Sequence, residues 1–303
     1  MMIVIEQVFL LMAFAAAGYG LSKAKIVTSS HSKLLSALCL YLFLPSKVFS
    51  TFATRFTQEY LAQKYPLLIA SAVTLILVAL IAIPASRLLT KNSYRRNVYH
   101  YSLTIPNYGY IGYALAEGIF GGEVLLDVMM FAFPTSLYTY TIGYCMLSKS
   151  KNPWKKLINP VTCAMVLGAI VGISGLELPK LVNTFLSRSS ACMSPASMLL
   201  MGIVISDYCL KNLLKNKEVY IITALRLLVI PCIVALGLKL LRLDSLVLPA
   251  LMIFSMPCGM NTIIFPKLVG EDCAPGASLA FVTSILCCLT IPLCLLLFSN
   301  GVI

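Results

Sequence analysis

The stretch TIPNYGYIGYALAEGIFGG, residues 104–122, interrupts an apolar segment with residues that do not suit a continuous helix. Pro106 has no backbone N–H, and its ring clashes with the preceding helical turn, whereas Asn107 suits the N-cap of a helix that restarts after it. Such a break frees N–H and C=O groups that find no partner in lipid, so it must be buried in protein or line a wet cavity. The stretch therefore predicts two half-helices that meet at a candidate binding site.

The composition is that of a polytopic membrane protein. Of 303 residues, 59% are hydrophobic and 11% are charged, and the mean hydropathy is +0.92. This leaves too little polar surface for a soluble globule. Runs such as SAVTLILVALIAI, residues 71–83, are continuously apolar and lack the alternation of barrel strands. We therefore expect an all-α protein embedded in the lipid bilayer.

Apolar runs of about 20 residues, the length that crosses a bilayer core, recur along the chain. They predict ten transmembrane helices. The predicted spans are 3–22, 32–53, 65–89, 97–120, 124–147, 157–175, 180–208, 218–240, 246–270 and 274–298. The first run is interpreted as a span and not as a cleaved signal peptide, because further apolar runs follow it directly.

Lysine and arginine are unequally distributed over the predicted loops. The loops after odd-numbered spans carry most of them, for example Lys155 and Lys156, whereas the loops after even-numbered spans carry few, for example Arg55 and Lys64. By the positive-inside rule the odd loops are cytoplasmic and both termini are extracytoplasmic. We expect a multi-pass protein of the cell (inner or plasma) membrane. Its net charge of +12 reflects topology and some attraction to anionic lipid, and it requires no nucleic acid partner.

Cysteine and histidine are not spaced for a metal or a disulfide framework. The eleven cysteines lie mostly inside predicted spans, there are two histidines, and there is no CxxC pair. The cysteines are interpreted as small buried apolar residues. No metal site and no cofactor are expected, and because no nucleophile–base pair is visible, we do not expect an enzyme.

Prolines indicate an internal repeat. Pro45 in the second span corresponds to Pro195 in the seventh, and Pro106 in the fourth corresponds to Pro257 in the ninth. The offsets nearly agree, since 195 − 45 = 150 and 257 − 106 = 151. Two five-helix units are predicted, residues 1–148 and 157–303, joined by a cytoplasmic connector at 149–156. Because five is odd, the second unit enters the membrane inverted relative to the first.

The ninth span repeats the break of the fourth. The stretch SMPCGMN, residues 255–261, contains Pro257, Gly259 and Asn261. If the pseudo-twofold axis brings the two breaks together, broken helices four and nine cross at the midplane and form a binding site. Two breaks at corresponding positions favour a site more strongly than one proline kink, which is usually structural.

Four stretches in this order resemble the auxin efflux carrier family of membrane transporters, the family of the plant PIN proteins. They are GYGLSKAKI (18–26), YLFLPSKVF (41–49), IPNYGYIGYALAEGIFG (105–121) and MPCGMNTIIFPKLVGEDCAPGASLAFVTSILCCLTIPL (256–293). The resemblance covers essentially the whole chain. Plant members carry a long cytoplasmic loop where this chain has only LSKSKNPWKK, which indicates a prokaryotic-type carrier.

The resemblance implies an elevator arrangement and a homodimer. Spans 1, 2, 6 and 7 would form the scaffold and dimer interface, and spans 3–5 and 8–10 the moving transport unit. It also implies that substrate lies beside the crossing of spans four and nine. The residues implied at this site are Pro106, Asn107, Pro257 and Asn261, with Ser255, Cys258 and Gly259 as neighbours.

The charge of the substrate can be argued locally. The N-terminal ends of half-helices favour a carboxylate, but the C-terminal ends have the opposite sign, so the dipoles alone do not decide. No predicted span carries an acidic residue at mid-depth, where a cation site or proton relay would need one. We expect a secondary active or potential-driven efflux carrier of a small organic anion, such as a carboxylate, dicarboxylate or auxin-like acid. The alternatives are a sodium-coupled symporter of the bile-acid type and a non-transporting membrane receptor.

Three further polar residues have two interpretations each, and a fourth, Arg226, has one. Lys47 either reaches the crossing and balances an anion or extends to the outer interface. Tyr138, near Ser136, either lines the cavity or packs. Asp207 is either functional or a solvated helix end, and Arg226 is expected to pair locally, with Asp207 as a possible partner.

Overall fold

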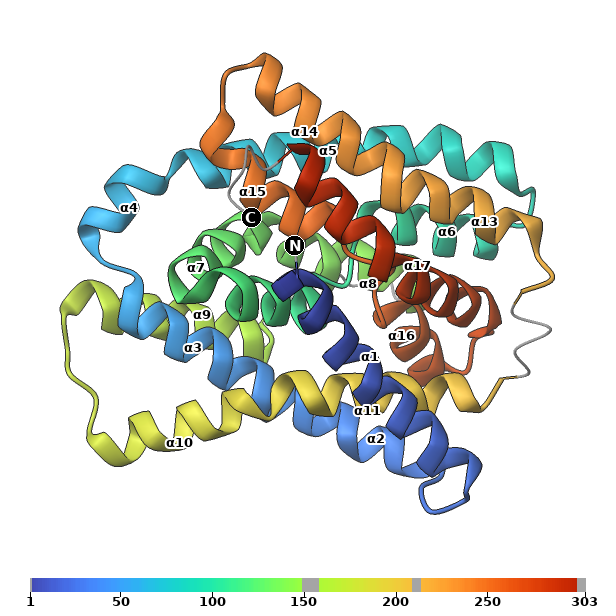
Figure 1. Cartoon of the computed structure of the whole chain (residues 1–303), viewed down its shortest axis with the longest axis horizontal. Coiled ribbons are helices and arrows are strands. Elements are labelled where there is room, and N and C mark those ends of the chain that lie inside the picture. The colour runs from blue at the N-terminus through green and yellow to red at the C-terminus, as the bar shows by residue number, and fades with distance from the viewer. Residues whose placement is uncertain (1, 149–157, 209–213, 299–303) are drawn as a thin grey trace.

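The protein is a bundle of helices in which several long helices are built from shorter segments (Figure 1). The computed structural model describes residues 2–148, 158–208 and 214–298. Within these ranges the only β-type pairing is an isolated bridge between Pro106 and Cys258. The all-α class predicted from composition is thus confirmed, while the whole of the predicted connector, residues 149–156, lies outside the described residues.

The helices follow one another with short connections. The first half contains α1 (Met2–Lys23), α2 (Ser29–Leu38), η1 (Cys39–Phe43), α3 (Leu44–Arg55), α4 (Gln58–Lys64), α5 (Pro66–Leu89), α6 (Ser93–Thr104), η2 (Tyr108–Gly112), α7 (Tyr113–Tyr138), η3 (Thr139–Gly143) and α8 (Tyr144–Ser148), where η denotes a π-helical turn. The second half contains α9 (Pro160–Ser174), α10 (Lys180–Ala191), α11 (Met193–Ser206), α13 (Lys217–Ala224), η5 (Leu225–Val229), α14 (Ile230–Leu240), α15 (Asp244–Phe254), α16 (Asn261–Val269) and α17 (Ala274–Phe298).

Five helical stretches within the described residues are long and apolar enough to cross a membrane. They are His31–Arg55, Pro66–Leu89, Lys180–Ser206, Lys217–Leu240 and Ala274–Phe298. Three apolar helices are shorter, namely Phe9–Lys23, Pro160–Ser174 and Asp244–Phe254. Helices also occupy the remaining predicted spans, but the number of ten transmembrane helices stays a prediction.

The long helix α7 changes direction at Gly121. This glycine has φ +82°, a left-handed conformation that is easily reached only without a Cβ. The chain therefore turns between the predicted fourth and fifth spans without leaving helical structure for more than one residue. The turn places Glu123 and Asp127 at the same end of the bundle as α4, where Lys64 Nζ lies 2.7 Å from an oxygen of Asp127.

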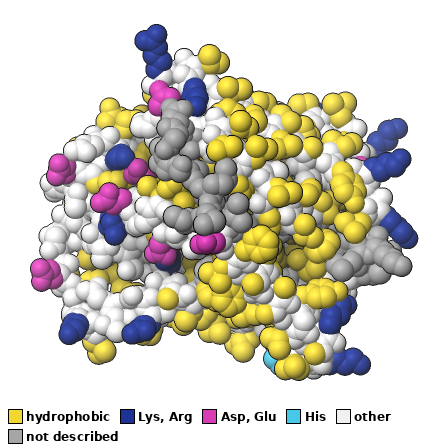
Figure 2. All heavy atoms as spheres, viewed as in Figure 1, with side chains coloured by type: hydrophobic (Ala, Val, Ile, Leu, Met, Phe, Trp, Pro, Cys, Tyr) yellow, Lys and Arg dark blue, Asp and Glu magenta, His cyan; other side chains and the backbone are white. Residues whose placement is uncertain are grey.

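Charged side chains are unevenly placed along the bundle. In the view of Figure 2, apolar side chains cover the middle of the molecule, Asp and Glu lie mainly toward the left end, and the right end carries Lys and Arg. The loop that joins α5 to α6 lies at this right end in Figure 1.

Two helix pairs approach each other backbone to backbone. The helix α1 packs along α11, and α3 packs along α9. A Cβ added at Gly18 would collide with the Leu199 carbonyl, and one at Gly168 would collide with the Phe49 carbonyl. Glycine thus permits the close approach at both interfaces, and the GxxxG pattern of Gly168 and Gly172 serves packing inside the chain.

Gly18→Ala should lower the stability of the folded protein, by about 1–3 kcal/mol as expected for overpacking. The matched control is Gly20→Ala on the same helix, where a Cβ would meet nothing within 4 Å. Thermal unfolding in detergent measures both variants. Equal unfolding temperatures for the two would contradict the close α1–α11 approach.

Candidate functional site

The two predicted breaks meet in the middle of the bundle. The helix α6 ends at Thr104, α15 ends at Phe254, and the chain restarts as η2 and α16 after each break. The backbone N–H of Asn107 donates to the carbonyl of Pro257 at 2.8 Å, and Pro106 and Cys258 form the antiparallel bridge. Each break therefore supplies hydrogen-bond partners for some backbone groups of the other. Backbone groups buried away from water need such partners.

A small cavity lies on one side of this crossing. Its volume is about 30 Å³. Its walls include the first residues after both breaks, together with side chains of α3, α7, η3 and α9, and they contain no charged side chain. The lining residues are Leu44, Pro106, Asn107, Tyr108, Gly109, Tyr110, Tyr113, Ser136, Tyr140, Val161, Gly259, Met260 and Asn261. The cavity has room for about two water molecules, so a carboxylic acid can enter only when the walls separate.

Asn107, a residue of the cavity wall, has an unused side-chain donor. The residue is 2% exposed, and its side-chain Nδ2 is buried without a hydrogen-bond partner among the described residues. A buried amide left unpaired costs about 1–3 kcal/mol, which a hydrogen-bonding ligand would recover. At the start of α16 the backbone N–H groups of Thr262 and Ile263 donate to the carbonyls of Gly259 and Met260, at 3.1 and 2.9 Å. The cavity wall thus combines the Asn107 amide with tyrosine and serine hydroxyls that can donate or accept.

The residues predicted at the breaks do not all line the cavity. Pro106, Asn107, Gly259 and Asn261 line the cavity, whereas Pro257, Ser255 and Cys258 do not. The Pro257 carbonyl is taken by Asn107, and the Cys258 N–H donates to Thr283 Oγ1 at 3.0 Å. Ser255 is the buried residue at the C-terminal end of α15.

Four tyrosines that sequence reasoning did not nominate surround the cavity. They are Tyr108, Tyr110, Tyr113 and Tyr140. The Tyr108 hydroxyl lies 2.9 Å from Ser136 Oγ, which holds both side chains against each other. Ser136 and Tyr140 are four residues apart and share a helix face, a periodicity that would have indicated Tyr140.

Tyr138 lies away from the cavity, because it is two residues from Ser136 and so projects from the opposite side of the helix. Its hydroxyl lies 3.1 Å from His100 Nε2. It lines a separate groove beside α5 and α6.

Arg226 is completely buried at the C-terminal ends of the half-helices and does not line the cavity. Its Nη1 donates to the Leu103 carbonyl at 2.9 Å, at the end of α6. Its Nε donates to the Met256 carbonyl at 3.1 Å and its Nη2 to the Ile253 carbonyl at 3.5 Å, at the end of α15. The guanidinium thus places one positive charge on two negative helix ends.

This arrangement differs from the pairing considered for Arg226. Its hydrogen bonds go to backbone carbonyls, whereas Asp207 is exposed at the C-terminal end of α11. Arg226 can bond to several carbonyls in place of one carboxylate because its guanidinium has five N–H groups in a planar arrangement.

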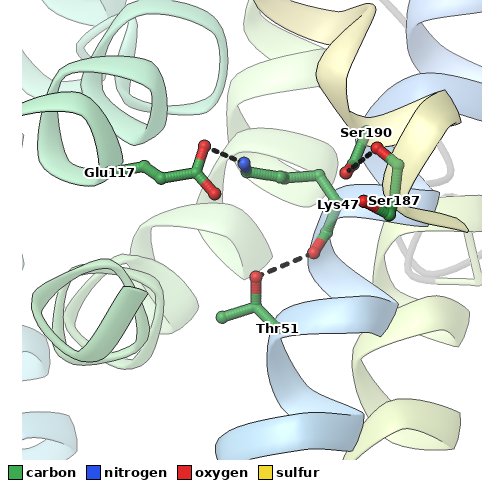
Figure 3. Close-up of polar contacts among 5 residues, drawn as sticks. All are labelled: Lys47, Thr51, Glu117, Ser187 and Ser190. Atoms are coloured by element: carbon green, nitrogen blue, oxygen red, sulfur yellow. Dashed lines mark hydrogen bonds and ion pairs between the residues drawn. The ribbon is translucent and has the colours of Figure 1, made fainter. Parts of the chain in front are cut away.

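Lys47 forms an ion pair with Glu117 (Figure 3). Lys47 lies on α3 and Glu117 on α7, and their side chains are 9% and 48% exposed. In Figure 3 the lysine extends from α3 toward Glu117 and away from Ser187 and Ser190. Lys47 is not part of the cavity lining, and its ammonium is paired with Glu117. An extension of Lys47 to the outer membrane interface stays a prediction.

The fold and the site together define a class, that of helical membrane proteins built around two crossed, broken helices. The sequence profile of the Membrane transport protein family, to which auxin efflux carriers are related, matches the chain twice, at residues 3–154 and 146–295. The chain belongs to this family, and the resemblance to the auxin efflux carriers is confirmed. It is therefore a membrane transporter.

Two archaeal relatives support this assignment. An uncharacterized transporter of Methanocaldococcus jannaschii is 23% identical over 96% of this chain and 98% of its own length. An uncharacterized transporter of Methanothermobacter thermautotrophicus is 25% identical over 62% of this chain and 63% of its own length. The first similarity extends over both halves of the chain.

Removing Glu117 should destabilise the protein more than removing Lys47. Glu117→Ala leaves a buried ammonium unpaired and should cost about 2–3 kcal/mol, whereas Lys47→Met leaves a half-exposed carboxylate that water can solvate and should cost under about 1 kcal/mol. The double variant Lys47→Met/Glu117→Ala should recover most of the loss. Denaturation of the purified variants measures these losses of stability. Equal losses in the two single variants would contradict the prediction.

Proposed function

We propose that the protein carries a small organic anion across the membrane by alternating access, with the crossing of the two broken helices as its substrate site. The observation that carries this proposal is the distribution of helix ends at the crossing. The cavity is lined by the first residues of η2 and α16, and Arg226 occupies the carbonyl ends of α6 and α15. The negative ends are thus compensated, and the positive ends remain available to a carboxylate.

The lining favours an anion by its chemistry as well. It offers backbone N–H groups, the amides of Asn107 and Asn261, and tyrosine hydroxyls, without a carboxylate that would bind a cation. A sodium-coupled symporter would want such a carboxylate near the site. Carboxylates, dicarboxylates and auxin-like acids fit the donors, with Pro106, Asn107, Gly259 and Asn261 as the proposed contacts.

The packing supports two inverted five-helix units, each of which contributes helices to a static scaffold and to a moving part. If α1 corresponds to α9 and α2–α3 to α10–α11, the α1–α11 pair becomes the α9–α3 pair when the units are exchanged. These four spans would form the rigid scaffold, with homodimerisation through it. Leu44 and Val161, which lie on the scaffold, close one wall of the cavity, so movement of the other spans past them would open it.

Flux into liposomes tests the function directly. The purified protein is reconstituted, and uptake of radiolabelled malonate, malate and indole-3-acetate is followed under an imposed voltage, with and without a sodium or proton gradient. Saturable flux of one acid is expected without a need for sodium. Binding without flux would instead favour a membrane receptor, and dependence on sodium would favour the bile-acid-type symporter.

Asn107→Ala and Asn261→Ala should each abolish this flux while the protein stays folded, because each removes an amide from the cavity wall. Asn183→Ala is the control, since Asn183 is exposed at the start of α10. Size-exclusion profiles and unfolding temperatures establish folding. Flux at the control level in both cavity variants would refute the assigned site.

Arg226 variants should separate charge from hydrogen bonding. Arg226→Lys keeps the charge beside the carbonyl ends, whereas Arg226→Gln keeps donors but removes the charge. If the charge compensates two helix ends, Arg226→Gln should raise the KM for the anion by roughly five- to thirtyfold, and Arg226→Lys should raise it much less. Equal KM values in the two variants would assign Arg226 to structure alone.

A further inference from the structure

A second polar groove lies away from the crossing, beside α5, α6 and the α7–α8 region. Its volume is about 410 Å³. One side consists of Arg87 and Ser86 at the end of α5 and of Ser93 and Arg96 at the start of α6. The lining includes two arginines and one histidine and no acidic side chain. The groove therefore carries positive charge without an internal counter-charge.

Arg96 is incompletely satisfied in this groove. The residue is half-buried, and its Nε is buried with no hydrogen-bond partner among the described residues. A buried guanidinium N–H without an acceptor is unfavourable, and a bound oxyanion would supply one. Arg87 is exposed at the mouth, where it can contact the same ligand.

The walls of the groove are held in place by other hydrogen bonds. Asn97 Nδ2 donates to the Met146 carbonyl at 3.1 Å, and His100 Nε2 lies 3.1 Å from the Tyr138 hydroxyl. These contacts tie α6 to α7 and α8 across the groove. The two arginines are thus presented by a formed site and not by a loose surface loop.

The remaining lining is apolar and faces outward. Ile83 is 37% exposed and Ile142 is 51% exposed, and Met146 lies beside them in the lining. In a membrane-embedded transporter such exposed aliphatic side chains on a helix face contact acyl chains. A groove lined by both basic and apolar residues matches the two parts of a phospholipid.

We propose that this groove binds the headgroup of an anionic phospholipid, with Arg87 and Arg96 contacting the phosphate and Ile83 and Ile142 contacting the acyl chains. Arginine suits this role because its planar fork binds phosphate oxygens in pairs. The groove is separate from the cavity at the crossing, and the two lining sets share no residue. The lipid site therefore does not depend on which solute the protein carries.

Native mass spectrometry of the full chain tests the site, with phosphatidylglycerol as the probe and phosphatidylcholine as the zwitterionic reference. Phosphatidylglycerol should bind more tightly than phosphatidylcholine. Arg87→Gln/Arg96→Gln should weaken phosphatidylglycerol binding by roughly fivefold per arginine and leave phosphatidylcholine binding unchanged. Arg188→Gln, which removes an exposed arginine of α10, is the control and should have no effect.

Three outcomes would overturn the proposal. The first is equal phosphatidylglycerol binding by the wild type and the double variant. The second is an equal loss in Arg188→Gln, which would mean that total charge alone decides. The third is displacement of the lipid by millimolar malonate, which would make the groove a solute site. If the double variant fails to fold, Arg87→Gln alone should show the fivefold loss, because its side chain is exposed. None of these readouts requires transport, so the carrier hypothesis can fail separately.

Discussion

The hydrogen bonds from Arg226 to the carbonyl ends of α6 and α15 are the interaction on which the crossing depends. Two interrupted helices leave polar backbone groups in the middle of an apolar bundle, where an unpaired group is costly. The antiparallel contact of Pro106 with Cys258 and the Asn107–Pro257 hydrogen bond satisfy one part of them. A single guanidinium satisfies three more carbonyls and opposes the negative ends of two helix dipoles at once.

The rest of the bundle differs in how closely its helices pack. The α1–α11 and α3–α9 pairs touch backbone to backbone through glycines, so they are poorly suited to sliding. The cavity instead borders larger side chains, such as Leu44 and Val161, on the same helices. Under the proposed function, close packing defines the static part and looser contact defines the boundary of the moving part.

The sequence predicted the all-α class and the two breaks, because apolar runs, and the prolines within them at an offset of 151 residues, can be recognised without tertiary contacts. It also placed Pro106, Asn107, Gly259 and Asn261 at one site, where the structure brings them together. It did not predict the partners of Arg226 and Lys47, since carbonyl ends and a facing carboxylate depend on tertiary packing. Tyr138 was predicted to line the cavity, whereas Tyr140 lines it in the structure. The sequence does not define how the helix is rotated about its axis, so it could not distinguish these two positions.

Under the proposed function, the separation of Arg226 from the cavity wall divides the recognition of a solute between two sets of residues. Arg226, which does not line the cavity, compensates the negative helix ends, whereas Tyr108, Tyr110, Tyr113 and Tyr140 shape the space. Replacements among the tyrosines can therefore enlarge or reshape the space without reversing its polarity. Related proteins that keep the arginine and vary the aromatic rings would diversify in the size of the acid they accept and not in its charge.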